Sequence, residues 1–177
     1  MRRAAMMLLF LLLLFSGCSP RHAPPPSAVS VLEAMQTAMV DTAQTLPDGI
    51  IRHRAVPMED PAYLTDTFLS ALYGEAARGL LDGDEHEGGA VGDAALFLSV
   101  MPYPCELAVF RCSDVRTASA VATICRGRLD TVAGGYDDSE WAAVAGNGVV
   151  TAEGCFVFLV IAEDPRRVIE RAVRCVR

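Results

Sequence analysis

The chain has 177 residues, of which 52% are apolar and 21% charged, which is enough for one domain with a sizeable core and a short leader. Its formal net charge is −7, and all 15 basic side chains are arginine. An acidic domain is repelled by phosphate backbones, and no basic stripe interleaved with aromatic residues offsets that repulsion. We therefore expect no nucleic-acid partner.

The first 18 residues have the pattern of an export signal. Arg2 and Arg3 precede an apolar stretch, residues 4–15, that is too short to span a bilayer comfortably. It ends in Phe-Ser-Gly-Cys at residues 15–18, which resembles the lipobox of bacterial lipoproteins. The resemblance implies a signal peptide over residues 1–17, diacylglycerol transfer to the Cys18 thiol and acylation, for example with palmitate, of the new amino terminus. An ordinary secretory leader or a short anchor helix are the alternatives.

A proline-rich segment follows the cysteine. Residues 18–28 contain Pro20 and the run Pro24-Pro25-Pro26, which favours polyproline II, a semi-rigid spacer without a core of its own. The sequence therefore predicts a tether over residues 18–28 and a single folded domain over residues 29–177. Lipid attachment at Cys18 would hold this domain at the extracytoplasmic face of the cell membrane, since two or more acyl chains give stable anchoring.

Two helices are predicted in the first part of the domain. Ser30 and Glu33 fit a capping box, and apolar residues at helical spacing follow until Pro47. Residues 50–56 are a short strand or an extended connector. A second helix is predicted to start at Asp60-Pro61 and to stop at Gly74. The acidic segment 82–89 has the oxygen ligands that hard cations prefer, but its spacing fits no calcium loop, and we expect a solvated surface loop.

The second half of the domain predicts two strand-strand-helix units. The strands are residues 94–101, 106–111, 149–151 and 155–162. One helix is capped by Ser113 or Asp114, and the other follows Asp164-Pro165. The run at residues 155–162, CFVFLVIA, is apolar on both faces, so it requires cover on both sides of a sheet. A 50-residue shift aligns Cys105 with Cys155 and Cys125 with Cys175. These features predict an α+β fold with an antiparallel four-stranded sheet, a ββαββα pseudo-repeat and two N-terminal helices.

The predicted arrangement of helices follows from that repeat. The two later helices are expected to cover one face of the sheet. The two N-terminal helices would cover the other face, or leave part of it open as a surface for a partner.

Five cysteines lie within the domain. An exported domain permits disulfides, and the repeat relates Cys105 to Cys155 and Cys125 to Cys175, so these are the pairs that the symmetry predicts. Cys112 would then be a small buried apolar residue. No Cys-x-x-Cys or His/Cys spacing indicates zinc, and no metal or cofactor is expected.

Three segments together resemble a known family. They are Leu72-Tyr73-Gly74, the strand ELAVFR at residues 106–111, and the segment from Gly148 to Asp164. With the lipobox and the tether, this layout is similar to bacterial lipoproteins that carry domain of unknown function 4358. This chain departs from the pattern at Glu75, where an isoleucine is usual, and in its five cysteines. The resemblance implies a cell-surface location, with no known activity and no catalytic residue.

Three functional hypotheses follow. The favoured one is a membrane-anchored binding or interaction module with a protein partner in the envelope, and a structural envelope component is the alternative. A hydrolytic enzyme is less favoured, because the sequence has no Gly-x-Ser-x-Gly elbow, metal triad or phosphate loop. His22, His53 and His86 fit exposed, solvated positions. The spacing in the sequence does not support a catalytic pair of His53 with Cys112 or Cys105.

Overall fold

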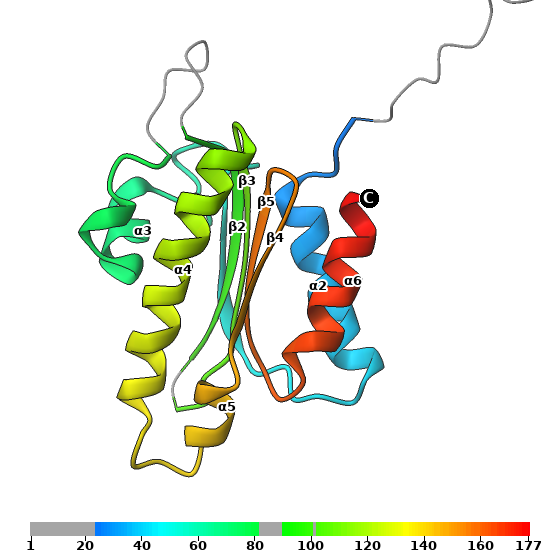
Figure 1. The fold of residues 1–177 in the computed structure, drawn as a ribbon, viewed down its shortest axis with the longest axis vertical. Helices are drawn as coiled ribbons and strands as arrows, with labels where there is room; N and C mark the ends of the chain where they lie inside the picture. The colour runs from blue at the N-terminus through cyan, green and yellow to red at the C-terminus, as the bar shows by residue number, and fades with distance from the viewer. Residues whose placement is uncertain (1–23, 82–89, 101) are drawn as a thin grey trace, which may run out of the picture.

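The computed structural model describes residues 24–81, 90–100 and 102–177, which form a five-stranded antiparallel sheet between two layers of helices (Figure 1). The order of the strands is β1-β2-β3-β5-β4. The strands are β1 (Gly49–His53), β2 (Val91–Ser99), β3 (Glu106–Cys112), β4 (Val149–Glu153) and β5 (Phe156–Ile161). The helices are α2 (Ala28–Asp41), α3 (Asp66–Tyr73), α4 (Val115–Gly135), α5 (Ala142–Gly146) and α6 (Pro165–Val176), with a 3-10 turn η1 (Glu75–Ala77).

Strand β5 is buried on both faces, as its two apolar faces predict. All six of its residues are buried. Phe156, Phe158 and Val160 pack into the core on the side of α2 and α6. The alternate residues Val157, Leu159 and Ile161 pack into the core on the side of α3 and α4. The period of two along a strand thus divides one apolar run between two separate cores.

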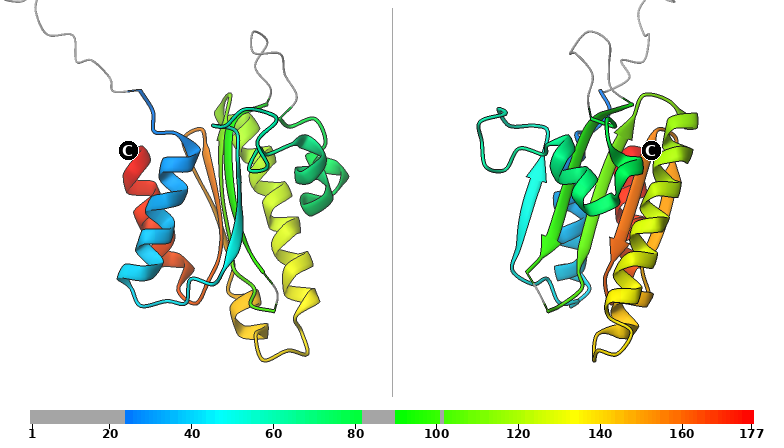
Figure 2. Two further views of the ribbon diagram at one scale, coloured as in Figure 1. Left: turned by 180° about the vertical axis from the view of Figure 1, so that it is seen from behind. Right: turned by 90° about the vertical axis from the view of Figure 1, so that its left-hand side faces the viewer.

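The helices cover the faces in a different grouping from the predicted one. Helices α2 and α6 pack together on one face, and α3 and α4 lie on the other (Figure 2). The prediction that the two N-terminal helices share a face is therefore wrong. Both faces of the sheet are apolar, so any of the helices could cover either face. The connections along the chain determine which helix packs on which face.

The sheet has five strands because β1 joins its edge. Each residue of β1 pairs with β2, from Gly49 opposite Ser99 to His53 opposite Ala95. The prediction of four strands is thus wrong, and the segment left open between strand and connector is a strand. Ile50 and Ile51 stay partly exposed, as is usual at a sheet edge, so this strand lacks the clean alternation that identifies strands in a sequence.

The ββαββα pseudo-repeat is not present in three dimensions. The 50-residue shift equates Leu107 with Val157, but Leu107 faces α2 and α6 whereas Val157 faces α4. Helix α4 and helix α6, which the repeat also equates, consequently lie on opposite faces of the sheet (Figure 1). Both halves consist of a hairpin followed by a capped helix, and this common order of elements is enough to explain the sequence similarity between them.

Local capping signals identified the later helices better than the earlier ones. Asp164 caps α6 as predicted, and of the two candidates for the cap of α4 it is Asp114 that serves, its Oδ1 accepting a hydrogen bond from Thr117 N at 2.7 Å. That hydrogen bond lowers the pKa of Asp114. Helix α2 instead has its N-cap at Ser27, three residues before the predicted cap Ser30, and α3 is capped by Thr65 instead of Asp60.

Some predictions concern residues outside the described part of the chain. These are the signal peptide, Cys18, His22, most of the tether, and the acidic segment with His86. Within residues 24–81, 90–100 and 102–177, no helix is long and apolar enough to cross a membrane.

Candidate functional site

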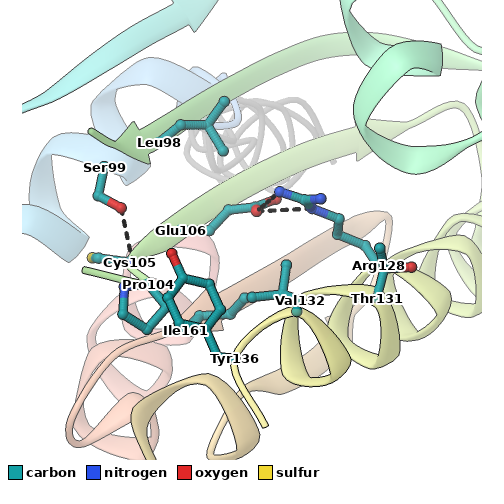
Figure 3. A pocket seen from close by; sticks show the side chains of 11 residues that line it. Leu98, Ser99, Pro104, Cys105, Glu106, Arg128, Thr131, Val132, Tyr136 and Ile161 are labelled. Carbon is teal, nitrogen blue, oxygen red and sulfur yellow. Dashed lines mark hydrogen bonds and ion pairs between the residues drawn. The ribbon is translucent and has the colours of Figure 1, made fainter. Parts of the chain in front are cut away.

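A pocket of about 280 Å³ opens between the ends of β2 and β3 and the C-terminal half of α4 (Figure 3). It combines apolar walls with a small number of polar side chains, which is the usual character of a ligand site. Its lining residues are Leu98, Ser99, Pro104, Cys105, Glu106, Arg128, Thr131, Val132, Gly135, Tyr136 and Ile161.

Glu106 is the central charged residue of this pocket. It opens β3, and its side chain points toward α4, where it is almost fully buried at 3% exposure. Its Oε2 accepts hydrogen bonds from Arg128 Nε at 2.9 Å and from Arg128 Nη2 at 2.8 Å (Figure 3). A buried carboxylate is costly unless it is paired and hydrogen-bonded, and Arg128 supplies both requirements.

Tyr73 is the second hydrogen-bond partner of the Glu106 carboxylate. Its hydroxyl donates to Glu106 Oε1 at 2.7 Å, and its ring meets the Phe110 ring edge-on at 5.7 Å. Burial, followed by the negative charge of Glu106, raises the pKa of Tyr73 well above its usual value. The hydroxyl therefore stays protonated and acts as a donor, so both oxygens of Glu106 are engaged.

Arg128 keeps donor capacity after pairing with Glu106. A guanidinium carries five N–H groups, and the two nitrogens that contact Glu106 each use one of them. Among the described residues, no side chain or carbonyl accepts from the others. Because Arg128 lines the pocket, these N–H groups can donate to a ligand held there.

The opposite wall of the pocket is formed by the turn between β2 and β3. The Ser99 hydroxyl donates to Tyr103 O and accepts from Cys105 N at 3.1 Å, which fixes the backbone of this turn. Burial, with a contribution from Glu106, raises the pKa of the Cys105 thiol to about 12. At neutral pH this thiol is therefore protonated and a weak nucleophile.

The two predicted disulfide pairs are not brought together. All five cysteines of the domain are free thiols. Cys105 precedes the end of β3 that pairs with Ile161, whereas Cys155 lies at the other end of the same ladder. Cys125 is buried under α4, and Cys175 is exposed on α6 across the sheet. The symmetry that suggested these pairs is absent, so the pairs are absent too.

His53 is also separated from the cysteines considered as its partners. It pairs with Ala95 of β2, so β2 lies between it and the strand that carries Cys112 and follows Cys105. Its Nδ1 accepts a hydrogen bond from Ala55 N at 3.2 Å. In the described part of the chain, no group of three or more His, Cys, Asp and Glu side chains could hold a metal ion.

Sequence reasoning did not identify the cluster of Tyr73, Glu106 and Arg128. The partners lie 33 and 22 residues from Glu106, and no periodic pattern connects them. A signal was nevertheless present: Tyr73 and Glu106 both fall within segments that carry the family resemblance, and Glu106 is a charged residue at the start of an otherwise buried strand. A charge in such a position requires a buried partner.

Comparison of the chain with protein families, with curated proteins and with solved structures gives no match. The fold and the pocket therefore define the protein only as an α+β domain with a mixed polar and apolar pocket.

Proposed function

We propose that this protein is a membrane-anchored, extracytoplasmic lipoprotein that acts as a binding module for a partner in the cell envelope. The lipobox before Cys18 and the proline-rich tether support the location. The observation that carries the binding role is the partly apolar pocket lined by Arg128, which among the described residues gives only two of its five N–H groups to Glu106. A relation to the lipoproteins with domain of unknown function 4358 is part of the same proposal.

The electrostatics of the pocket favour a neutral hydrogen-bond acceptor. Glu106 already balances the charge of Arg128 at 2.8 Å, so an anionic ligand would gain little from the guanidinium and be repelled by the carboxylate. A carbonyl oxygen accepts from an arginine without that repulsion. Leu98, Val132 and Ile161 provide apolar contact beside it. We therefore infer a peptide segment of an envelope protein as the partner.

A structural role in the envelope is the second candidate. Helices cover both faces of the sheet, and the residues of β3 and β5 are almost all buried. A domain of this kind needs no ligand to complete its core. A binding module requires a ligand in the pocket for its function, whereas a structural component does not.

The anchor is tested by membrane partition. We expect the native chain to fractionate with membranes and the Cys18→Ser variant to be released into the soluble fraction, because the variant has no thiol for acylation. Detergent extraction of the native form is the control for aggregation. Retention of Cys18→Ser in the membrane fraction after a high-salt wash would contradict lipid anchoring.

The pocket is tested by a pair of neighbouring glycines on α4. Gly135 lines the pocket and Gly134 does not, and a Cβ at either position meets no atom within 4 Å. We expect Gly135→Leu to lower the recovery of a crosslinked partner from intact membranes at least tenfold, since the leucine side chain would occupy the cavity. Gly134→Leu should leave the recovery unchanged.

The outcome separates the two candidates. Loss of the crosslinked partner in Gly135→Leu alone supports a binding module that uses this pocket. A partner recovered equally with both variants would place the interaction elsewhere on the domain. A native chain that crosslinks to no protein, while remaining in the membrane fraction, would favour the structural role.

A further inference from the structure

Two cysteines meet where β3 ends and β5 begins. Cys112 is the last residue of β3, and Cys155 is the second residue of the tight turn that joins β4 to β5. In that turn Glu153 pairs with Phe156, and Gly154 has a φ of 56°, a value that glycine adopts without strain. The turn fixes the position of Cys155 relative to the sheet.

The strand register places these two residues opposite each other. Arg111 pairs with Phe156, and Cys112 N donates to Cys155 O at 2.8 Å, which continues the antiparallel ladder by one residue. Directly opposite residues that are hydrogen-bonded to each other in such a ladder have Cα atoms about 5.5 Å apart. A disulfide requires a Cα separation of about 4.4–6.8 Å, so the backbone is already in the range for a bond.

The two side chains also share a face of the sheet. Cys112 packs into the core on the side of α4, and alternation along β5 places Cys155 on the same side as Val157. Both residues also contribute to the lining of a pocket of about 520 Å³ at this end of the sheet, although Phe156 and Val176 of the same pocket lie on the side of α2 and α6. Cys155 is partly exposed and Cys112 is buried, so an oxidant reaches Cys155 first.

The environment of Cys112 is consistent with a neighbouring thiol. Burial raises the pKa of Cys112 to about 12, and the second cause is the charge of Cys155. Cys112 is therefore protonated at neutral pH, and the more accessible Cys155 is the thiol that an oxidant meets first.

We propose that Cys112 and Cys155 form a cross-strand disulfide by exchange with a small or protein-borne disulfide oxidant. The Cys155 thiolate attacks one sulfur of the oxidant and releases the other as a thiol. The Cys112 thiol then loses its proton and attacks the Cys155 sulfur, which releases the second thiol of the oxidant. Two protein thiols are oxidised and one oxidant disulfide is reduced to two thiols. Formation in the cell depends on the proposed extracytoplasmic location, whereas the geometry does not.

Trypsin separates the cysteines cleanly, because this chain has no lysine and its arginines isolate each domain cysteine. Cys105, Cys112, Cys125, Cys155 and Cys175 fall in the peptides 79–111, 112–116, 117–126, 129–166 and 175–177. After incubation of the full-length protein with oxidised glutathione and alkylation of free thiols, we expect peptide 112–116 linked to peptide 129–166. A link between any other pair, or alkylation of all five thiols, would overturn the proposal.

A thermal measurement provides a second readout. The disulfide closes the chain from Cys112 to Cys155, and a loop of that size should raise the Tm of the oxidised protein by about 5–10 °C over the reduced protein. In Cys112→Ser the difference between oxidised and reduced samples should vanish, whatever the absolute Tm of that variant. Cys105→Ser is the matched control and should keep both the linked peptide and the shift.

This test is independent of the proposed function. Failure of the linked peptide to form with glutathione refutes the cysteine pair even if the protein is a lipoprotein. Release of Cys18→Ser and of the native chain alike into the soluble fraction would refute the anchor and leave the cysteine pair standing.

Discussion

Replacement of Arg128 by methionine is expected to lower the free energy of unfolding by about 3–5 kcal/mol. The change removes the partner at 2.8 Å from a carboxylate whose side chain is only 4% exposed. Glu106 would retain the Tyr73 hydroxyl as its hydrogen-bond donor but lose its compensating charge. Urea unfolding followed by circular dichroism at neutral pH measures the loss.

The double variant Glu106→Gln/Arg128→Met separates the cost of the charge from the cost of packing. Glutamine is neutral and still presents an oxygen to the Tyr73 hydroxyl, so we expect it to restore most of the stability lost in Arg128→Met. If the double variant is as unstable as the single one, the loss comes from changed packing where the guanidinium of Arg128 is removed and not from the unpaired charge of Glu106. A single variant within about 1 kcal/mol of the native chain would contradict the importance of the pair.

Truncation of Phe158 to alanine is expected to cost about 3–5 kcal/mol of stability. Phe158 is fully buried at the centre of β5, and its ring stacks near Phe156 with 6.2 Å between centroids. Alanine would lose the transfer free energy of the ring and leave a cavity between the sheet and the helices α2 and α6. Chemical unfolding with an unchanged m-value would assign the loss to the folded state.

Phe158→Leu is the matched control, because leucine retains most of the apolar volume and should cost about 1–2 kcal/mol. A loss in Phe158→Ala no larger than in Phe158→Leu would mean that the surrounding residues collapse into the space. In that case the core on this face would be less tightly packed than the burial of Phe158 indicates.

The sequence alone determined the features that depend only on residues close together along the chain. The alternating apolar faces of β5 required a sheet covered on both sides, and all six residues are buried. Asp114 and Asp164 with Pro165 marked the starts of α4 and α6, since a side-chain cap needs only the next three residues. An antiparallel sheet in an α+β domain follows from hairpin-sized connections, and the structure has that architecture.

The tertiary structure alone decided how these elements combine. Two faces of equal apolar character do not specify which helix covers which, so α2 packs against α6 and α3 against α4. The local sequence left residues 50–56 open between a strand and a connector, and Gly49–His53 forms a strand because it pairs with the edge of β2. Glu106, Arg128 and Tyr73 meet only when a strand and two helices are assembled, and Cys112 faces Cys155 only through the register of β3 and β5. Local sequence fixes periodicity and caps, whereas register and layer order depend on packing between segments distant in the chain.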